Sequence, residues 1–222
     1  LSASETISGA GLLTFVLSDL DLYAGYQGMG VQLTGGSLSI ATITANKTPA
    51  TEVKDKRSWT ALSAAIGSAG LVGIDRVSAT LSDLSLQINQ ASGKYDPNVN
   101  VSGDELKAQA LDWTTALDLN ADGVFGDVLN PGALLPTPVD LTVSLTGPLL
   151  QVSGRLAELN VYDVLVGSAQ FALSTQTVDV KLSASETISG AGLLTFVLSD
   201  LDLYAGYQGM GVQLTGGSLS IA

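Results

Sequence analysis

The sequence predicts an all-β protein, built as an elongated antiparallel β-sheet, a sandwich or a solenoid-like repeat module with long strands and at most one short helix. Apolar residues mostly alternate along the chain instead of recurring every three or four positions. Thr, Ser, Val and Gly dominate the alternating segments, and this composition suits a pleated sheet better than a helix. In addition, the first 41 residues, Leu1–Ala41, return without one substitution as Leu182–Ala222.

This duplication sets a period of 181 residues, since the second copy begins at 182 and 182 − 1 = 181. We interpret residues 1–181 as one full repeat unit and 182–222 as the start of the next, identical unit. A weaker repeat, Leu-x-Asp/Glu-Leu-x-Leu/Val, recurs inside the unit at Leu17, Leu81 and Leu156. The unit is therefore expected to contain β-subunits near 1–50, 58–93 and 139–181, with a loop-rich insert at 94–138.

Alternation predicts the individual strands in chain order. Val31 and Leu33, followed by Leu38 and Ile40, predict two short strands joined by a turn at the glycine pair between them. Segment 58–70 is rich in small residues and is expected to be a strand. Further strands are predicted over 139–145 and 170–182.

The segment 103–113 has a different pattern. It carries good helix formers, and Asp104 with Glu105 would suit the N-terminus of a helix. We expect a short helix or an irregular loop there.

The Leu-x-Asp/Glu-Leu repeat also predicts a break in the regular strand. Leu17 and Leu20 differ in parity, so they can point to the same face only if an extra residue is inserted between them. A bulge or corner near Ser18 and Asp19 would satisfy this, with the acid turned to solvent.

Composition excludes several functions. The chain has 9 Lys and Arg against 21 Asp and Glu, a net charge of −12, which repels nucleic acid. It has neither Cys nor His, which excludes disulfides, thiolate chemistry, His-based catalysis and the usual zinc and haem sites. Mean hydropathy is high at +0.36, yet no apolar run approaches the roughly 20 residues of a membrane span. No catalytic constellation is visible, so we do not expect an enzyme.

One segment, DLNADGVFGD at 118–127, has the sequence pattern of a calcium-binding loop. It is similar to the D-x-N-x-D-G core of EF-hand and dockerin loops, which place oxygen ligands at positions 1, 3 and 5, a glycine at 6 and a backbone carbonyl at 7. The departure is at position 12, which is Leu129 instead of Glu, so the nearest acid stands at position 10. The predicted Ca²⁺ ligands are Asp118, Asn120, Asp122, Val124 and Asp127. The competing interpretation is an acidic turn without metal.

Other polar and aromatic groups carry weaker signals. Asp96, Asn98 and Asn100 form a second metal candidate that lacks the glycine. The basic cluster 54–57 is interpreted as a solvated turn. Trp59 and Trp113 are interpreted as core anchors in preference to sugar-stacking platforms.

Several segments together suggest a family. These are LSAAIGSAGLVGI (62–74), VSATLSDLSLQINQASG (77–93), ALDW (110–113) and GRLAELNVYDVLVGSAQFALS (154–174). In their general sequence character they resemble the tandem repeats of giant bacterial secreted or cell-surface proteins, the adhesin-like class with calcium-binding segments. The resemblance implies an extracellular array on the bacterial surface, exported by a signal-peptide-independent route.

The function expected from these observations is a structural tandem-repeat module of a fibre, stalk or adhesin, stiffened by calcium. Its partners would be neighbouring identical repeats in the same chain, or copies joined end to end in a fibre. The alternative is a β module that binds a surface glycan or a receptor.

Overall fold

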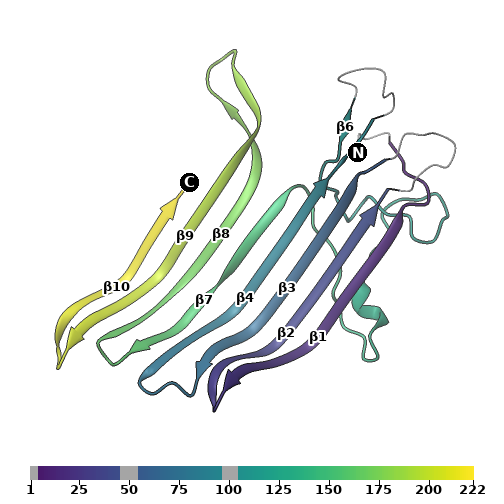
Figure 1. Cartoon of the computed structure of the whole chain (residues 1–222). Helices are drawn as coiled ribbons and strands as arrows, with labels where there is room; N and C mark the ends of the chain where they lie inside the picture. The colour runs from purple at the N-terminus through teal and green to yellow at the C-terminus, as the bar shows by residue number, and fades with distance from the viewer. Residues whose placement is uncertain (1–4, 46–54, 97–104) are drawn as a thin grey trace. The chain divides into compact units, whose positions relative to one another are not determined.

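The computed structural model describes residues 5–45, 55–96 and 105–222 (Figure 1). Eight strands form one antiparallel sheet whose spatial order follows the chain order. They are β1 (Gly11–Tyr26), β2 (Met29–Thr44), β3 (Ser58–Val72), β4 (Val77–Ser92), β7 (Leu149–Val161), β8 (Leu165–Lys181), β9 (Thr187–Tyr207) and β10 (Met210–Ile221). A second sheet pairs β5 (Lys94–Tyr95) with β6 (Leu106–Lys107). The all-β prediction is confirmed.

Helix is almost absent from the residues that the structure describes. The one helical element there is a four-residue 3-10 turn, η1 (Pro131–Leu134), which Asn130 caps by accepting a hydrogen bond from the amide of Gly132. Within the predicted helix-or-loop segment, the described residues 105–113 form an irregular loop that contains only β6. Over the described ranges, no helix has the length and apolar character needed to cross a membrane.

The predicted bulge near Asp19 is confirmed, and the same backbone conformation recurs at two other copies of the motif. Asp19, Asp83 and Asp200 all have φ near +50° (52°, 53° and 47°) in the middle of strands, and all three are exposed. Opposite Asp200, residues 198–201 of β9 face only 217–219 of β10, so β9 carries one extra residue. The copy of the motif at Leu156 shows the same shift in register, because Leu156 and Leu159 of β7 pair with Ala169 and Gly167 of β8. The inserted residue lets both leucines of each motif point to one face.

The predicted turn at Gly35 is wrong, because β2 runs through this position as one strand. Gly35 has a φ of 65°, and the carboxylate Oδ1 of Asp21 accepts a hydrogen bond from its amide at 3.0 Å. Gly216 repeats this arrangement in the second copy, with a φ of 64° and a 3.0 Å bond to Asp202. The change of parity between Leu33 and Leu38 therefore marks an irregularity within a strand, and glycine is needed because the backbone is left-handed there.

The true turn of this hairpin lies at Gln27 and Gly28. Their φ values of 51° and 81° are those of a two-residue type I′ turn, which matches the twist of the flanking strands. The second copy turns in the same way at Gln208 and Gly209, with 53° and 81°.

The chain divides into two compact units, and β1 to β4 contribute residues to both. Unit 1 contains residues 1–16, 38–63 and 87–149; unit 2 contains 17–37, 64–86 and 150–222.

Unit 1 holds the hydrophobic core. Its strands contribute four residues to the buried hydrophobic cluster, and loops of the segment 111–145 contribute six more: Ala41, Ile43, Trp59 and Ala61, then Leu111, Trp113, Leu117, Leu129, Val143 and Leu145. Trp59 and Trp113 are each 1% exposed, so both are core anchors as predicted.

The predicted strand at 139–145 is wrong, although its alternation is correct. Val143 and Leu145 are buried while Thr142 and Ser144 are exposed. Their backbone partners are loop groups, since Val143 N donates to Leu129 O at 2.9 Å and Leu145 O accepts from Trp113 N at 3.0 Å. An extended segment bonded to loops at single points forms no ladder.

Asn89 joins these loops to β4. It is 1% exposed, and its amide nitrogen donates to the carbonyls of Leu111 and Gly147, both at 2.7 Å. Its carbonyl accepts the indole N–H of Trp113 at 2.9 Å. One buried amide therefore satisfies three polar groups that would otherwise lose water without replacement.

Unit 2 is constructed differently. Among its described residues, Ala169 is the one hydrophobic side chain that is buried, and most others on its strands are half-buried or exposed. The strands are held by their backbone ladders, with added side-chain bonds such as Ser174 to Thr195 at 3.2 Å and Ser78 to Glu158 at 2.6 Å.

The two identical copies differ in strand length. Gly11, where β1 begins, corresponds to Gly192, yet β9 begins five residues earlier at Thr187. The additional residues pair with the end of β8, and the five residues between the two strands are closed by a bond from Leu182 N to Glu186 O at 2.9 Å. The left-handed positions are nonetheless the same in both copies, including Gly9 at 69° and Gly190 at 72°. Local conformation therefore follows the sequence, while strand length follows the neighbour.

The bulges predict a position-specific response to substitution. Asp83→Asn should leave stability nearly unchanged, because Asn tolerates a positive φ, whereas Asp83→Val should cost about 1–2 kcal/mol in the free energy of unfolding. Gln90→Val is the matched control, since Gln90 is exposed on the same strand without a positive φ. Urea unfolding measures all three, and equal losses for the two valine variants would contradict the bulge assignment.

Candidate functional site

The DLNADGVFGD segment forms a loop in unit 1 that wraps around Asp118. The two carboxylate oxygens of Asp118 accept hydrogen bonds from the amides of Asp122 at 3.2 Å and Gly123 at 2.9 Å. The Asn120 side chain also accepts from the Asp122 amide, at 2.9 Å, and the Asp122 side chain accepts from Val124 at 2.8 Å. The oxygens at positions 1, 3 and 5 therefore belong to one tight turn.

Asp127 closes the base of this loop. Its Oδ2 accepts from the amides of Leu119 at 2.7 Å and Asn120 at 3.2 Å, and the carbonyl of Leu117 accepts from the amides of Gly126 and Asp127. Leu117 and Leu129 on either side of the loop are buried in the core of unit 1. The loop is thus a closed turn fixed at both ends to a packed core.

Backbone conformation explains the glycine at position 6. Gly123 has a φ of 84°, and an added Cβ there would meet nothing within 4 Å. Glycine is favoured at this position for its left-handed backbone, as the calcium-loop pattern requires, and crowding plays no part.

The donor set suits a hard cation. Carboxylate, amide and backbone oxygens are the ligands that Ca²⁺ prefers, and each carboxylate oxygen can accept a backbone amide and still face an ion. Asp118 and Asp127 are half-buried, while Asn120, Asp122 and Val124 are exposed. The described residues contain no group of three or more His, Cys, Asp or Glu side chains arranged to hold a metal, and the twelfth position is the buried Leu129.

The weaker metal candidate is only partly described. Asp96 is half-buried after β5, whereas Asn98 and Asn100 lie outside the described residues.

An open cleft of about 940 Å³ lies beside the calcium-type loop within unit 1. Its lining mixes acids with apolar groups and includes Glu5, Ile7, Asp112, Asp118 and Phe125. Phe125 is 50% exposed, so its ring is accessible at the cleft. A cleft of this character could hold a small polar ligand or a bound cation with its hydration.

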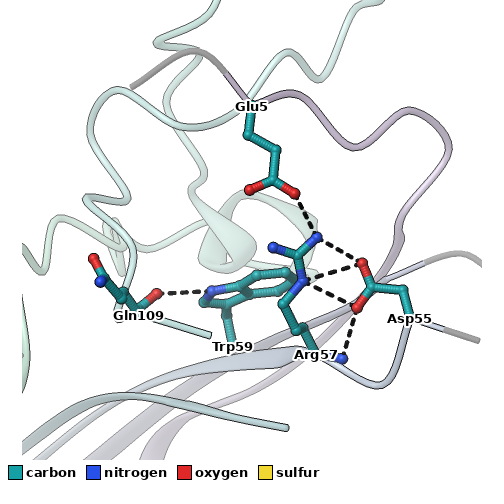
Figure 2. Close-up of polar contacts among 5 residues, drawn as sticks. All are labelled: Glu5, Asp55, Arg57, Trp59 and Gln109. Carbon is teal, nitrogen blue, oxygen red and sulfur yellow. Dashed lines mark hydrogen bonds and ion pairs between the residues drawn. The ribbon is translucent and has the colours of Figure 1, made fainter. Parts of the chain in front are cut away.

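Arg57 is a buried ionic centre that sequence reasoning missed (Figure 2). The solvated turn predicted for 54–57 is wrong for Arg57, which is 3% exposed. Its Nη2 contacts Glu5 at 2.6 Å and Asp55 at 2.7 Å, and its Nε donates to both carboxylate oxygens of Asp55. The guanidinium also lies over the rings of Trp59 at 5.7 Å and Tyr95 at 5.4 Å.

A sequence signal for this burial existed. Arg57 shares its parity with Trp59 and Ala61, and all three are buried on one face of the chain. The indole nitrogen of Trp59 donates to the carbonyl of Gln109 at 2.9 Å, so the same face holds the loop that leads to the candidate site (Figure 2).

The pKa of Asp55 reflects this pairing. Burial by itself raises the pKa, but the hydrogen bonds from the side chain and backbone of Arg57, together with its charge, lower the pKa below the ordinary value of 3.8. The same contacts raise the pKa of Arg57. The ionised pair is therefore favoured in the folded chain over the unfolded chain.

Because the folded pKa of Asp55 is lowered, its stabilising effect is complete above pH 3.8 and is lost as the pH falls through the lowered value. Asp55→Asn should cost about 2 kcal/mol at pH 7, because it weakens charge-assisted hydrogen bonds to Arg57 while Glu5 still pairs with it, and the cost should shrink on acidification. Urea unfolding at pH 7, 4 and 3 measures this, with Asp75→Asn in the exposed β3–β4 turn as control. A cost that does not change with pH would exclude the ionised pair as its source.

No family model, curated protein or solved structure matches this chain.

Proposed function

We propose that the chain is a structural tandem-repeat module of an extracellular bacterial fibre, stalk or adhesin. The observation that carries the proposal is the position of the second copy in the sheet. After β8, the duplicated residues form β9 and β10, which extend the same sheet in chain order. A repeat that joins its neighbour by strand pairing is suited to a load-bearing array, since each unit contacts the units before and after it.

The period of this array would be six strands. Strands β1 to β4, β7 and β8 fall within the 181-residue unit, and β9 is β1 of the next unit. Completing the second unit would add four strands at the β10 edge, and each later unit would add six. The extracellular and bacterial setting rests on the resemblance of the sequence to surface repeats.

Calcium is proposed to stiffen each unit through the loop at 118–127. The closed turn around Asp118 and its attachment through Leu117 and Leu129 support this, because an ion bound there would be coupled to the core of unit 1. The chain carries a net charge of −12, so cation binding would also reduce its self-repulsion.

A glycan- or receptor-binding module is the second candidate. It is favoured by the cleft in unit 1, where the half-exposed Phe125 stands near the acids Asp112 and Asp118. Tyr95 is a poorer anchor for a sugar ring, because it is half-buried over Arg57.

Calcium should raise the melting temperature of the chain. At about 100 times the dissociation constant, a single site adds about 2.7 kcal/mol to the free energy of unfolding. Asp118→Asn and Asp122→Asn should abolish most of this gain, since the amide keeps an acceptor for the backbone but removes the charge. Asp140→Asn is the control, because Asp140 makes a similar turn by accepting from the amide and hydroxyl of Thr142 outside the loop. The calcium proposal fails if wild type melts alike in calcium and in chelator.

Chains of one, two and four units test the array itself. The radius of gyration, measured by small-angle X-ray scattering, should rise nearly in proportion to the number of units. Compact packing would instead follow about the 0.38 power of chain length. Compact scaling, joined with glycan binding that Phe125→Ala abolishes and Phe15→Ala does not, would favour the second candidate. The two phenylalanines are matched in exposure, at 50% and 51%.

A further inference from the structure

The β1 strand has one open edge. It stands first in the strand order of the sheet, so among the described strands it has β2 as its only neighbour. Its part in unit 2 is Leu17–Tyr26. An edge strand presents alternate backbone N–H and C=O groups without partners, and such a row is a template for another strand.

The same residues appear a second time with this edge covered. Subtracting 181 converts each β9 number to its β1 twin, so Leu198–Tyr207 is the twin of Leu17–Tyr26. Strand β8 pairs with β9 through Phe171 opposite Leu198, Gly167 opposite Leu203 and Leu165 opposite Ala205. Transferred to β1, this register places Phe171 opposite Leu17, Gly167 opposite Leu22 and Leu165 opposite Ala24.

Side-chain exposure differs between the twins in the direction that a missing strand would produce. Leu17, Leu22 and Tyr23 are 36%, 48% and 49% exposed. Their twins Leu198, Leu203 and Tyr204 are less exposed, and each of them is half-buried. The sequences are identical and the left-handed positions coincide, so the extra exposure of β1 reports the absence of β8.

One polar contact in the covered copy has an equivalent acceptor at the open edge. In the covered copy, the amide of Gln170 donates to the carboxylate of Asp200 at 2.6 Å, at the bulge where Asp200 has a φ of 47°. Asp19 has the same bulge with a φ of 52° and lies exposed at the open edge. A strand with a carboxylate at this position would be repelled, whereas one with a side-chain amide is accepted.

We propose that the unit 2 edge of β1, Leu17–Tyr26, is the acceptor for the β8 strand of another 181-residue unit placed ahead of Leu1, with Gln170 of that strand bonded to Asp19. The inference rests on the proposed tandem array, and it adds the strand, the register and the recognition contact. The junction between units is then a continuous backbone ladder.

Hydrogen exchange read by mass spectrometry tests this, because the duplicated peptides have equal masses and are observed in one spectrum. For the 222-residue chain, a peptide from within Leu17–Tyr26 and its twin should give two envelopes of equal intensity. The β1 amides that point away from β2 should exchange at least about tenfold faster than the equivalent β9 amides, which face β8. One more unit, residues 1–181 placed before Leu1, makes three copies. The proposal predicts one fast envelope, from the new first copy, and two slow ones, from the original β1 and from β9. Two fast envelopes and one slow envelope would overturn it.

Gln170→Glu in the added unit alone provides the test of specificity. It should return the middle copy toward fast exchange, because the new carboxylate faces Asp19. Gln176→Glu in the same added strand is the control, since it makes an equal charge change elsewhere on β8. Equal effects of the two variants would overturn the recognition contact.

The outcomes separate the edge from the array. One fast and two slow envelopes with compact scattering would refute the extended fibre but support pairing at the β1 edge. Two fast envelopes and one slow envelope with extended scattering would refute the edge pairing but support the fibre. A single slow envelope for the 222-residue chain that depends on protein concentration would show that another chain covers β1, and it would overturn the proposed occupant.

Discussion

Backbone pairing between neighbouring strands is the interaction on which unit 2 depends. Hydrophobic burial contributes little there, because Ala169 is the one buried apolar side chain among its described residues. A strand in such a sheet gains most of its order from partners at its two edges. The bulges at the aspartates and the tight turn at Gln27 matter for the same reason, since each fixes the register in which those partners meet.

In unit 1, the stabilising contacts lie on a face of the strands, where loops pack against them. Loops from 111 to 145 cover the strands, and their backbone groups are satisfied by single buried side chains such as Asn89. Arg57 is held in the same region by Asp55 and Glu5, and its carboxylate partners offset the cost of burying the charge. The candidate calcium loop is attached to this packed core, so any ion bound there would act on the stability of unit 1.

Much of the fold could be predicted from local patterns. Alternation identified β8 and the two parts of β2, the small-residue segment 58–70 lies within β3, and the parity of Leu17 and Leu20 identified the bulge at Asp19. The misplaced turn at Gly35 shows the limit of this approach, because a glycine pair between alternating runs is compatible with a turn or with an irregular strand. Asn89 was missed because its partners lie 22 to 58 residues away. The candidate calcium loop was visible as a motif, but its closure by Asp127 onto Leu119 and Asn120 required the three-dimensional arrangement.

The five residues between β8 and β9 have a consequence for synthesis. In an array of identical units, a newly made β8 meets two equivalent acceptors, the β1 of its own unit and the β9 that follows. Pairing with its own β1 would end the sheet. The connection through Leu182–Glu186 gives β9 a far higher effective concentration at β8 than any distant copy has. In the proposed array, this short linker would favour continued growth over self-closure, although both acceptors have the same sequence.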